Sequence, residues 1–457
     1  MNALIISAIM GVVMMFSGVL LKQRSAILAV ALSGLFVSIV LNVMEMYGFH
    51  LFRINLNGMM HFDRFSLFFN TIAMGCTFIF FLLSAKEMEK VGLSYADYFA
   101  LIFFILCGII LSSSFSSLLI LFLGIEIISI PLYILTGSDK RNLKSNEASL
   151  KYFLLGVFST GLMLMGITFI YGHSGSFTID LVTPPETKPG ILLIAGLLLL
   201  TFSMAFKVSA APFHFWTPDV YDGAPTVFTS FMATIVKAAV FIAFIRLFYH
   251  SFADIHATWK YLVALITALT LFIGNITAVF QQSVKRMLAY SSIAQAGFML
   301  MAILALNSIA SEGILLYTTA YCLATIGLFA ILVKMKDYTF EGFNGFAKHQ
   351  PILAAAAVIF LLSLAGIPLT AGFLAKFYMI NAVISRGGFL WLVIFAVLMA
   401  AVSVYYYFRV IQAMYFKDGE AQTIEVSPAF KWVISLVAAL VILLGVYPQL
   451  LFSWYYF

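Results

Sequence analysis

The stretch Thr201–Trp216 reads TFSMAFKVSAAPFHFW, and it places one lysine in a mostly apolar segment. Lys207 is the only formal charge in a run of about twenty-five residues. An ammonium group at the centre of a bilayer costs about 2.5–3.5 kcal/mol on insertion scales. Pro212 follows five residues later, and a proline inside a helix removes a backbone hydrogen bond and kinks or breaks the helix. The stretch therefore predicts a charged and interrupted membrane helix.

The composition of the whole chain is typical of a membrane protein. The 457 residues are 63% hydrophobic and only 10% charged, whereas soluble domains carry roughly 25% charged residues. The net charge of +6 is consistent with basic loops at a membrane face and requires no nucleic acid partner. The three cysteines, Cys76, Cys107 and Cys322, each lie alone in an apolar run. Because no CxxC pair exists, we expect no iron–sulfur or zinc site.

The hydrophobic pattern predicts an all-α polytopic membrane protein, because a spanning helix needs about 20 apolar residues. Some fourteen spans are predicted, at 2–21, 26–44, 62–84, 97–113, 115–136, 149–171, 190–215, 226–248, 258–279, 284–306, 313–335, 351–381, 388–416 and 430–454. The connections between them are too short to fold alone. We therefore expect a single membrane domain over residues 1–457.

Basic residues in the connections predict the orientation. The odd-numbered connections contain fourteen lysines and arginines. The even-numbered ones contain four, namely Arg53, Lys188, Lys260 and Arg386. Because positively charged loops stay on the cytoplasmic side, the odd-numbered connections are expected to face the cytoplasm. Both termini are then expected on the non-cytoplasmic side.

Four ionisable residues lie inside predicted spans, namely Glu126, Lys207, Lys237 and Lys376. If each stayed charged and unpaired, their insertion would cost on the order of 10 kcal/mol. Glu126 can pair with a lysine, and burial favours the uncharged form of a lysine without a partner. Because there are three lysines and only one glutamate, structural ion pairs do not account for all four residues. A file of such groups linked by water is a proton path, so we interpret them as proton-translocation residues.

The twelfth predicted span is interrupted like the seventh. Gly366 and Pro368 lie eight to ten residues before Lys376, in a span longer than one straight crossing needs. Broken helices are tolerated at membrane depth where they line a hydrated cavity. Interrupted helices in the two halves of a transporter indicate its transport site. Discontinuous helices are therefore predicted near Pro212 and Pro368.

Other polar residues have supporting or purely structural interpretations. His214, just past the first proline, could relay a proton or donate to a carbonyl freed by the helix break. Lys151 falls in the first turn of the sixth predicted span, from which it could simply reach the interface. Ser292 and Gln295 lie midway along the tenth span and could bind water or neighbouring helices. Arg409 is expected to be an anchor near a helix end.

Four segments carry a resemblance to a known family, namely GIEIISIPLYIL (124–135), KVSAAPFHFWTPDVYDGAPT (207–226), SVKRMLAYSSIAQAGF (283–298) and IPLTAGFLAKFYM (367–379). They resemble the antiporter-like subunits of NADH–quinone oxidoreductase (respiratory complex I) and of Mrp-type cation/proton antiporters. The resemblance covers roughly residues 60–416. The LGIEIISIPLY pattern is most similar to the subunit N branch. Another branch usually carries a glutamate where this chain has Lys376, and the largest continues into a lateral helix beyond the length of this chain.

The resemblance implies two inverted five-helix repeats, at 97–248 and 258–416, with flanking helices at 1–84 and 430–454. It implies that Glu126 and Lys207 form a carboxylate–lysine pair, that Lys237 is a bridging lysine and that Lys376 is a terminal one, exchanging protons with the outer side. Lys151 matches a lysine at the head of the sixth helix of subunit N. Gln295 stands where several relatives have a histidine. Because glutamine cannot titrate, bound water is expected to carry protons at that position.

The resemblance also implies a mechanism. Quinone reduction in neighbouring subunits would perturb the Glu126–Lys207 pair and push a proton toward Lys237 and Lys376. NADH, FMN, iron–sulfur clusters and quinone would all bind to partner subunits, with no redox cofactor in this chain. The implied partners are the other membrane subunits of complex I, including homologous antiporter-like subunits, and the lipid bilayer. The implied location is the bacterial plasma (inner) membrane.

Three alternatives remain open. A subunit of an Mrp-type antiporter or of a membrane-bound hydrogenase would share the same glutamate and lysines. A membrane cytochrome would use facing histidines as haem ligands, and only His214 of the seven histidines approaches the interior of a span. A non-pumping scaffold subunit would have no need of the four intramembrane charges.

Overall fold

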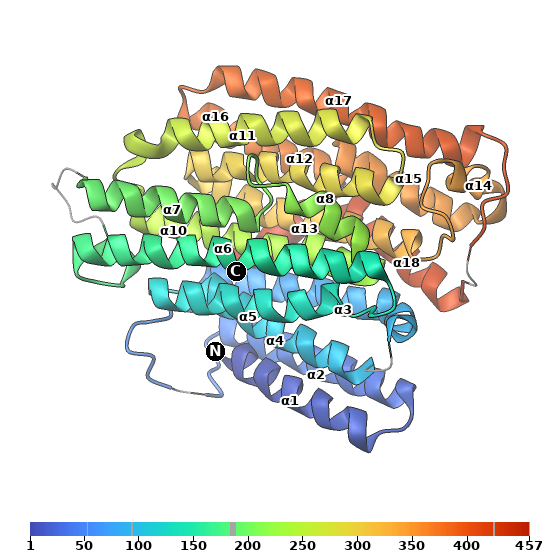
Figure 1. Cartoon of the computed structure of the whole chain (residues 1–457), viewed down its shortest axis with the longest axis horizontal. Coiled ribbons are helices and arrows are strands. Elements are labelled where there is room, and N and C mark those ends of the chain that lie inside the picture. Colours follow the sequence, from blue (N-terminus) through green and yellow to red (C-terminus); the bar gives the residue numbers. More distant parts are fainter. Residues whose placement is uncertain (53, 93–94, 183–188, 424–425, 457) are drawn as a thin grey trace.

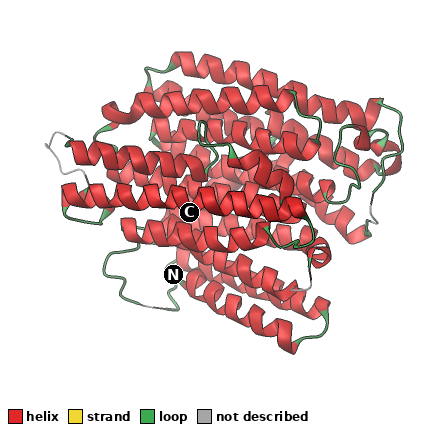
Figure 2. Ribbon diagram, viewed as in Figure 1, coloured by secondary structure: helices red, strands yellow, loops and turns green. Residues whose placement is uncertain are grey.

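The computed structural model describes residues 1–52, 54–92, 95–182, 189–423 and 426–456. Arg53 and Lys188, which contributed to the predicted orientation, lie outside these ranges. The described helices lie side by side along the longest axis of the molecule (Figure 1). Within the described ranges every regular element is a helix, as Figure 2 shows, and strand-like pairing is limited to isolated bridges. The predicted all-α membrane fold is confirmed.

The first ten α-helices are α1 (Asn2–Leu20), α2 (Arg24–Met46), α3 (Arg64–Val91), α4 (Tyr95–Ser114), α5 (Leu118–Thr136), α6 (Leu143–Ser174), α7 (Ile191–Lys207), α8 (Trp216–Gly223), α9 (Thr226–Phe231) and α10 (Lys237–Ser251). The others are α11 (His256–Val279), α12 (Val284–Ala305), α13 (Ser308–Leu332), α14 (Phe346–His349), α15 (Pro351–Ala365), α16 (Ala371–Arg386), α17 (Leu390–Phe416), α18 (Pro428–Val446) and α19 (Gln449–Tyr456).

Twelve helical segments in the described part of the chain are long and apolar enough to cross a membrane, with α9, the turn after it and α10 counted as one. The seventh predicted span, 190–215, contains only the shorter helix α7, and α8 begins directly after it. The twelfth, 351–381, contains α15 and most of α16. Twelve of the fourteen predicted spans thus contain a helical segment long and apolar enough to cross a membrane, and the seventh and twelfth fall at interrupted helices.

Several predicted boundaries are wrong; the third span, for example, was predicted to end at 84, but α3 extends to Val91. Helix α6 begins at Leu143, because the Asn142 side chain accepts a hydrogen bond from the backbone N–H of Lys144 at 3.0 Å and caps the helix there. Lys151 consequently lies more than two turns inside α6, and not in its first turn. The last predicted span, 430–454, is not continuous: α18 ends at Val446, just before Pro448, because the residue preceding a proline disfavours helical geometry.

Helix direction alternates along the chain and separates the loops into two groups. The connections 21–23, 137–142, 280–283, 333–350 and 417–423 lie at one end of the molecule, on the right in Figure 1 near α14. This end, which carries most of the loop lysines and arginines, is called the basic end below. The loops 47–52, 54–63 and 175–182 lie at the opposite end, on the left in Figure 1.

The helices differ in how far they are enclosed by protein. The apolar stretches of Thr226–Ser251 and α13 are wholly buried inside the bundle, whereas only about a third of the residues in those of α1, α2 and α18 are buried. In Figure 1, α1 and α17 lie at opposite edges of the bundle. Of the two buried stretches, Thr226–Ser251 carries Lys237 and α13 carries Tyr317, so protein and not lipid surrounds these two polar side chains.

The first helix break is confirmed near the predicted proline. Between α7 and α8 the chain turns tightly over residues 208–215, where Ser209 adopts a φ of +64°. Backbone groups freed by the break find partners: the Trp216 indole donates to the Phe206 carbonyl at 3.0 Å. The Ala211 N–H donates to the Thr270 hydroxyl at 2.9 Å. These contacts satisfy backbone groups that lipid would leave without partners.

The second helix break is confirmed at Gly366. This glycine has a φ of +84°, a left-handed conformation that glycine adopts without steric cost and that commonly ends a helix. Its N–H and that of Ile367 both donate to the Leu362 carbonyl at 3.0 Å. Helix α16 starts after Thr370.

A π turn interrupts the enclosed span 226–251. Residues Met232–Val236 form this wider turn, and Lys237 is the residue that follows it. Turns of this kind inside α-helices are rare and are frequently found at functional sites. No pattern in the sequence predicted it.

Candidate functional site

Glu126 lies on α5 and is partly buried. One oxygen of its carboxylate accepts a hydrogen bond from the Thr160 hydroxyl of α6 at 2.7 Å. The same hydroxyl also lies 3.0 Å from the carbonyl oxygen of Gly156, one turn earlier on α6, and shares its one proton between the two acceptors. The carboxylate is therefore held by a neutral side chain from the neighbouring helix.

Lys207, the last residue of α7, does not form the expected ion pair with Glu126. Its Nζ donates to the Ser129 hydroxyl at 2.9 Å, and Ser129 donates in turn to the Ile125 carbonyl at 2.8 Å. Among the described residues, no ion pair joins Glu126 and Lys207. Because Ser129 lies about one helical turn after Glu126 on α5, the two charges occupy adjacent turns.

Lys237 is almost fully buried, with 1% of its surface exposed. Its Nζ donates to the Ser292 hydroxyl of α12 and to the Ser292 carbonyl at 3.1 Å. The ammonium also lies 5.8 Å from the centre of the Tyr221 ring, which attracts a cation weakly. Ser292, a predicted supporting residue, therefore contacts Lys237 directly.

Lys376 lies at the second helix break. Its Nζ donates to the carbonyls of Leu364 and Ala365 at 2.8 and 2.9 Å. These are the last carbonyls of α15, and the C-terminus of a helix carries partial negative charge. The ammonium also lies 4.8 Å from the centre of the Phe298 ring. The interruption of the helix thus creates the acceptor site for the lysine.

A chain of polar side chains lies beside Lys376. Gln295 donates to the Leu364 carbonyl at 2.9 Å, the same carbonyl that Lys376 binds, and to the Tyr407 hydroxyl at 3.2 Å. Tyr317 donates to the Gln295 side-chain oxygen. Ser291 shares a hydrogen bond of 2.6 Å with Tyr407. Gln295 is therefore the centre of the polar cluster between α12, α13 and α17.

Sequence reasoning missed the tyrosines of this cluster. The Tyr321 hydroxyl, one turn from Tyr317 on α13, is buried without a hydrogen-bond partner among the described side chains. A cavity of about 10 Å³ lies against Gln295 and both tyrosines, and a single water needs roughly this space and two to four polar partners. The spacing of two tyrosines four residues apart within an apolar span was the signal available in the sequence.

Lys151 takes part in a charged network, so its ammonium does not merely reach toward an interface. It forms ion pairs with Glu147 at 2.8 Å and with Asp219 of α8 at 3.0 Å. Asp219 also pairs with Arg286 of α12 at 3.0 Å. These side chains line a cavity of about 160 Å³ toward the basic end. The second half of the interrupted helix is thus tied to both α6 and α12.

His214 lies in the first helix break and is 6% exposed. Its Nδ1 is buried and makes no hydrogen bond within the described part of the protein. The structure does not bring His214 into contact with the four charged residues, and it joins none of the networks above. Both interpretations of this histidine remain predictions.

Arg409 has a different role from the anchor that was expected. Its guanidinium donates to the carbonyls of Val279 and Gln281 at 2.7 and 3.3 Å. Val279 is the last residue of α11, so Arg409 of α17 caps that helix. The guanidinium also lies 4.0 Å from the centre of the Phe340 ring.

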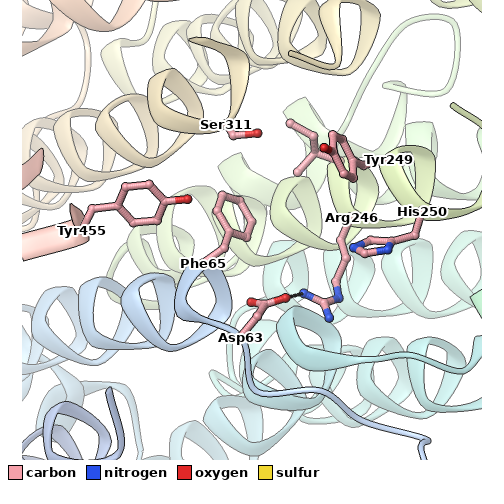
Figure 3. A pocket seen from close by; sticks show the side chains of 8 residues that line it. Asp63, Phe65, Arg246, Tyr249, His250, Ser311 and Tyr455 are labelled. Carbon is pink, nitrogen blue, oxygen red and sulfur yellow. Dashed lines mark hydrogen bonds and ion pairs between the residues drawn. The ribbon is translucent and has the colours of Figure 1, made fainter. Parts of the chain in front are cut away.

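A pocket of about 250 Å³ opens at the opposite end of the bundle. Figure 3 shows the Asp63 carboxylate facing the Arg246 guanidinium, with His250 and Tyr249 beside them and Tyr455 across the pocket. Arg246 also donates to the Phe115 carbonyl at 2.8 Å. Because its donors are engaged by protein groups, Arg246 joins the start of α3 to the α4–α5 connection and is not free to hold an anion.

No group of three histidine, cysteine, aspartate or glutamate side chains that could hold a metal ion occurs in the described residues. All three cysteines are free and buried.

Comparisons with known proteins give consistent results. Residues 116–444 match the family model described as NADH:quinone oxidoreductase/Mrp antiporter, transmembrane. A Cytophaga hutchinsonii protein named NADH-quinone oxidoreductase subunit N is 42% identical over 86% of this chain and 87% of its own length. One of the same name from Flavobacterium psychrophilum is 35% identical over 98% of this chain and 99% of its own. A chain of respiratory complex I from Thermus thermophilus superposes with a TM-score of 0.86 and 30% identity, covering 99% of this chain and 98% of that one.

Proposed function

Because the chain belongs to the NADH:quinone oxidoreductase/Mrp antiporter family, we propose that it is a proton-translocating membrane subunit of an NADH–quinone oxidoreductase. The names of the relatives that match it over nearly their full length support this assignment. NADH oxidation and quinone reduction then take place in partner subunits, with FMN, iron–sulfur clusters and quinone bound there. This chain contributes the membrane path and not the redox chemistry.

The observation that carries the proposal is the environment of the three lysines. The Nζ atoms of Lys207, Lys237 and Lys376 each donate to neutral oxygens, from serine hydroxyls or backbone carbonyls. A lysine locked in a tight ion pair holds its proton strongly, because the paired carboxylate favours the charged form. A lysine facing neutral acceptors can both hold and release a proton. These lysines are therefore suited to transfer.

Glu126 couples the relay to the rest of the complex in this proposal. Its charge lies about one helical turn from the Ser129 hydroxyl that binds Lys207. At an effective dielectric constant of about 20, two unit charges roughly 8 Å apart interact by about 2 kcal/mol. That is close to the roughly 2.3 kcal/mol needed to move one charge against 100 mV. A change in the field at Glu126 is thus of the right size to contribute to moving a proton from Lys207 toward Lys237.

The remaining transfers follow the polar groups already described. From Lys237 the route continues along α12, from Ser292 to the cluster around Gln295. Gln295 and Lys376 share the Leu364 carbonyl, so a proton carried by water at this cluster arrives within one hydrogen bond of Lys376. We place the basic end at the cytoplasm, following the positive-inside rule. Both termini then lie on the non-cytoplasmic side of a bacterial inner membrane.

The test uses inverted membrane vesicles that contain the assembled complex. NADH-driven quinone reduction and vesicle acidification are recorded together for the wild type and for Lys207→Ala, with assembly checked on native gels. The matched control is Lys348→Gln, an exposed lysine of the basic end whose one ion pair within the described part of the chain is with Asp418. We expect both activities to collapse in Lys207→Ala and to persist in the control.

The opposite result would place the chain in another branch of its family. If Lys207→Ala leaves NADH oxidation and acidification untouched in assembled complexes, the relay is refuted. If deleting the whole chain leaves NADH oxidation untouched but abolishes cation/proton exchange, the chain is instead a subunit of an Mrp-type antiporter. The family model covers both kinds of protein.

A further inference from the structure

Two hollows adjoin each other at the basic end, outside the lysine relay. The larger has a volume of about 750 Å³ and lies among the ends of α3 and α4 and the α5–α6 connection. The smaller has a volume of about 370 Å³ and lies between α5 and α6. They share Tyr133, Ile134, Gly137 and Ser149 as lining residues, so they form one continuous depression. We call them the charged cavity and the α5–α6 groove.

The α5–α6 groove is a mainly apolar depression, and Gly137 lies at its floor. A Cβ atom at Gly137 would lie 2.8 Å from the Ser149 hydroxyl, so a larger residue would fill the floor. The Ser149 hydroxyl donates to the Tyr133 carbonyl at 2.8 Å and so presents no free donor to the groove. Ile134 and Leu150 are 54% and 58% exposed at its walls. The groove therefore suits a hydrocarbon chain.

The charged cavity carries both signs of charge in equal number. Two of its lining residues already have partners, since Lys90 pairs with Glu87 at 2.7 Å and Glu89 pairs with Arg24. The four others, with no ion pair among the described residues, are Asp97, Asp139, Lys140 and Arg141. These side chains are exposed or partly exposed, so a molecule that fills this cavity can offer one group to the cations and another to the carboxylates.

We propose that the charged cavity and the α5–α6 groove together bind one phospholipid with a phosphoethanolamine headgroup. Lys140 and Arg141 would hold the phosphate, the group that basic pockets at this membrane face commonly recognise. Asp97 and Asp139 would accept hydrogen bonds from the primary ammonium. One acyl chain would lie in the groove along Ile134, where an exposed apolar trough inside a bilayer meets hydrocarbon.

The charge balance selects this lipid over others of similar size. A headgroup with a net negative charge would face the two carboxylates without a cation of its own to offset them. A phosphocholine headgroup has no N–H to donate to Asp97 or Asp139, whereas ethanolamine has three donors. The proposal does not depend on the lysine relay, because none of the lining residues belongs to it.

The experiment uses the assembled complex in vesicles that contain a photoreactive phosphatidylethanolamine, or a phosphatidylglycerol with the same photoreactive acyl chain. Cross-linked peptides are mapped by mass spectrometry. We expect phosphatidylethanolamine to label residues 134–153 about tenfold more than phosphatidylglycerol, the factor that one hydrogen bond to a charged group provides. Lys140→Gln with Arg141→Gln, and separately Leu150→Trp, should reduce this labelling, whereas Lys348→Gln should not.

Several results would overturn the proposal. Equal labelling by the two lipids would show an ordinary lipid-facing surface. Labelling that persists in both variants would show that the cavity and the groove are not the binding site. If neither lipid labels this segment in the wild-type complex, a neighbouring subunit covers it. The comparison of the two lipids in the wild type decides the question even if a variant fails to assemble.

Discussion

Replacing Gly366 by alanine is expected to uncouple proton movement from NADH oxidation, because the added methyl group would enter the space of Lys376. A Cβ atom at this position would lie 2.9 Å from Cδ and 3.4 Å from Nζ of Lys376. Carbon atoms in contact prefer a separation of about 3.5–4.0 Å. The lysine side chain must therefore move by roughly half an ångström or more.

The magnitude follows from the two hydrogen bonds that this movement disturbs. Nζ lies 2.8 and 2.9 Å from the carbonyls of Leu364 and Ala365. A hydrogen bond from a charged group contributes about 1.5–3 kcal/mol, so losing one would reduce the population of correctly placed ammonium by about 10- to 150-fold. The left-handed backbone adds a separate cost of about 1–2 kcal/mol for any residue with a Cβ.

The control for backbone strain is Gly175→Ala. Gly175 ends α6 with a φ of +67°, also left-handed, but a Cβ there would meet no atom within 4 Å. Acidification of inverted vesicles per NADH oxidised is measured for both variants, with assembly compared on native gels. We expect Gly175→Ala to pump like the wild type and Gly366→Ala to lose most of its pumping. Equal pumping by the two variants would refute the reasoning, because strain alone would then explain any effect.

Three further substitutions test other contacts. Thr160→Val removes the hydroxyl that binds Glu126, and the lost charged hydrogen bond of about 1.5–3 kcal/mol should lower vesicle acidification without loss of assembly; unchanged acidification would contradict it. Arg409→Met leaves the last carbonyls of α11 uncapped and should lower the thermal unfolding temperature of the complex while pumping at low temperature persists. Lys334→Met breaks a buried ion pair of 2.5 Å with Glu87. Removing one partner of a buried ion pair usually destabilises a protein by ~3–5 kcal/mol. We expect a smaller loss here, because Lys90 still pairs with Glu87. In the double variant that also carries Glu87→Leu, the thermal unfolding temperature should return toward that of the wild type.

The length of the apolar segments, and the charged residues inside some of them, allowed much of the fold to be predicted. The interruptions near Pro212 and Gly366 could be anticipated because proline and glycine change the backbone locally, whatever surrounds them. The burial of Lys237 and Lys376 could be anticipated for a similar reason, since both lie in apolar runs too long for the side chain to reach water.

The partners of these lysines could not be predicted in the same way. Ser129 stands where a direct contact between Lys207 and Glu126 was expected, and one helical turn decides which group the ammonium meets. Tyr407 joins the cluster at Gln295 from a helix more than a hundred residues away. Such contacts depend on how helices pack and rotate against one another, and a single sequence does not encode that rotation in any local pattern. The π turn before Lys237 likewise has no local sequence pattern that predicts it.

The neutral surroundings of Lys237 and Lys376 have a consequence for how many protons the subunit can hold at once. A proton that arrives at either lysine brings a positive charge that no adjacent carboxylate in the described residues cancels. Two unit charges repel by roughly 1.7 kcal/mol at about 10 Å and an effective dielectric constant of about 20, so at a spacing of that order a proton on one lysine disfavours a proton on the other by more than tenfold. Loading is therefore anticooperative under the proposed mechanism. The number of protons moved in one cycle would then be limited by the distances between the lysines and not by the number of lysines.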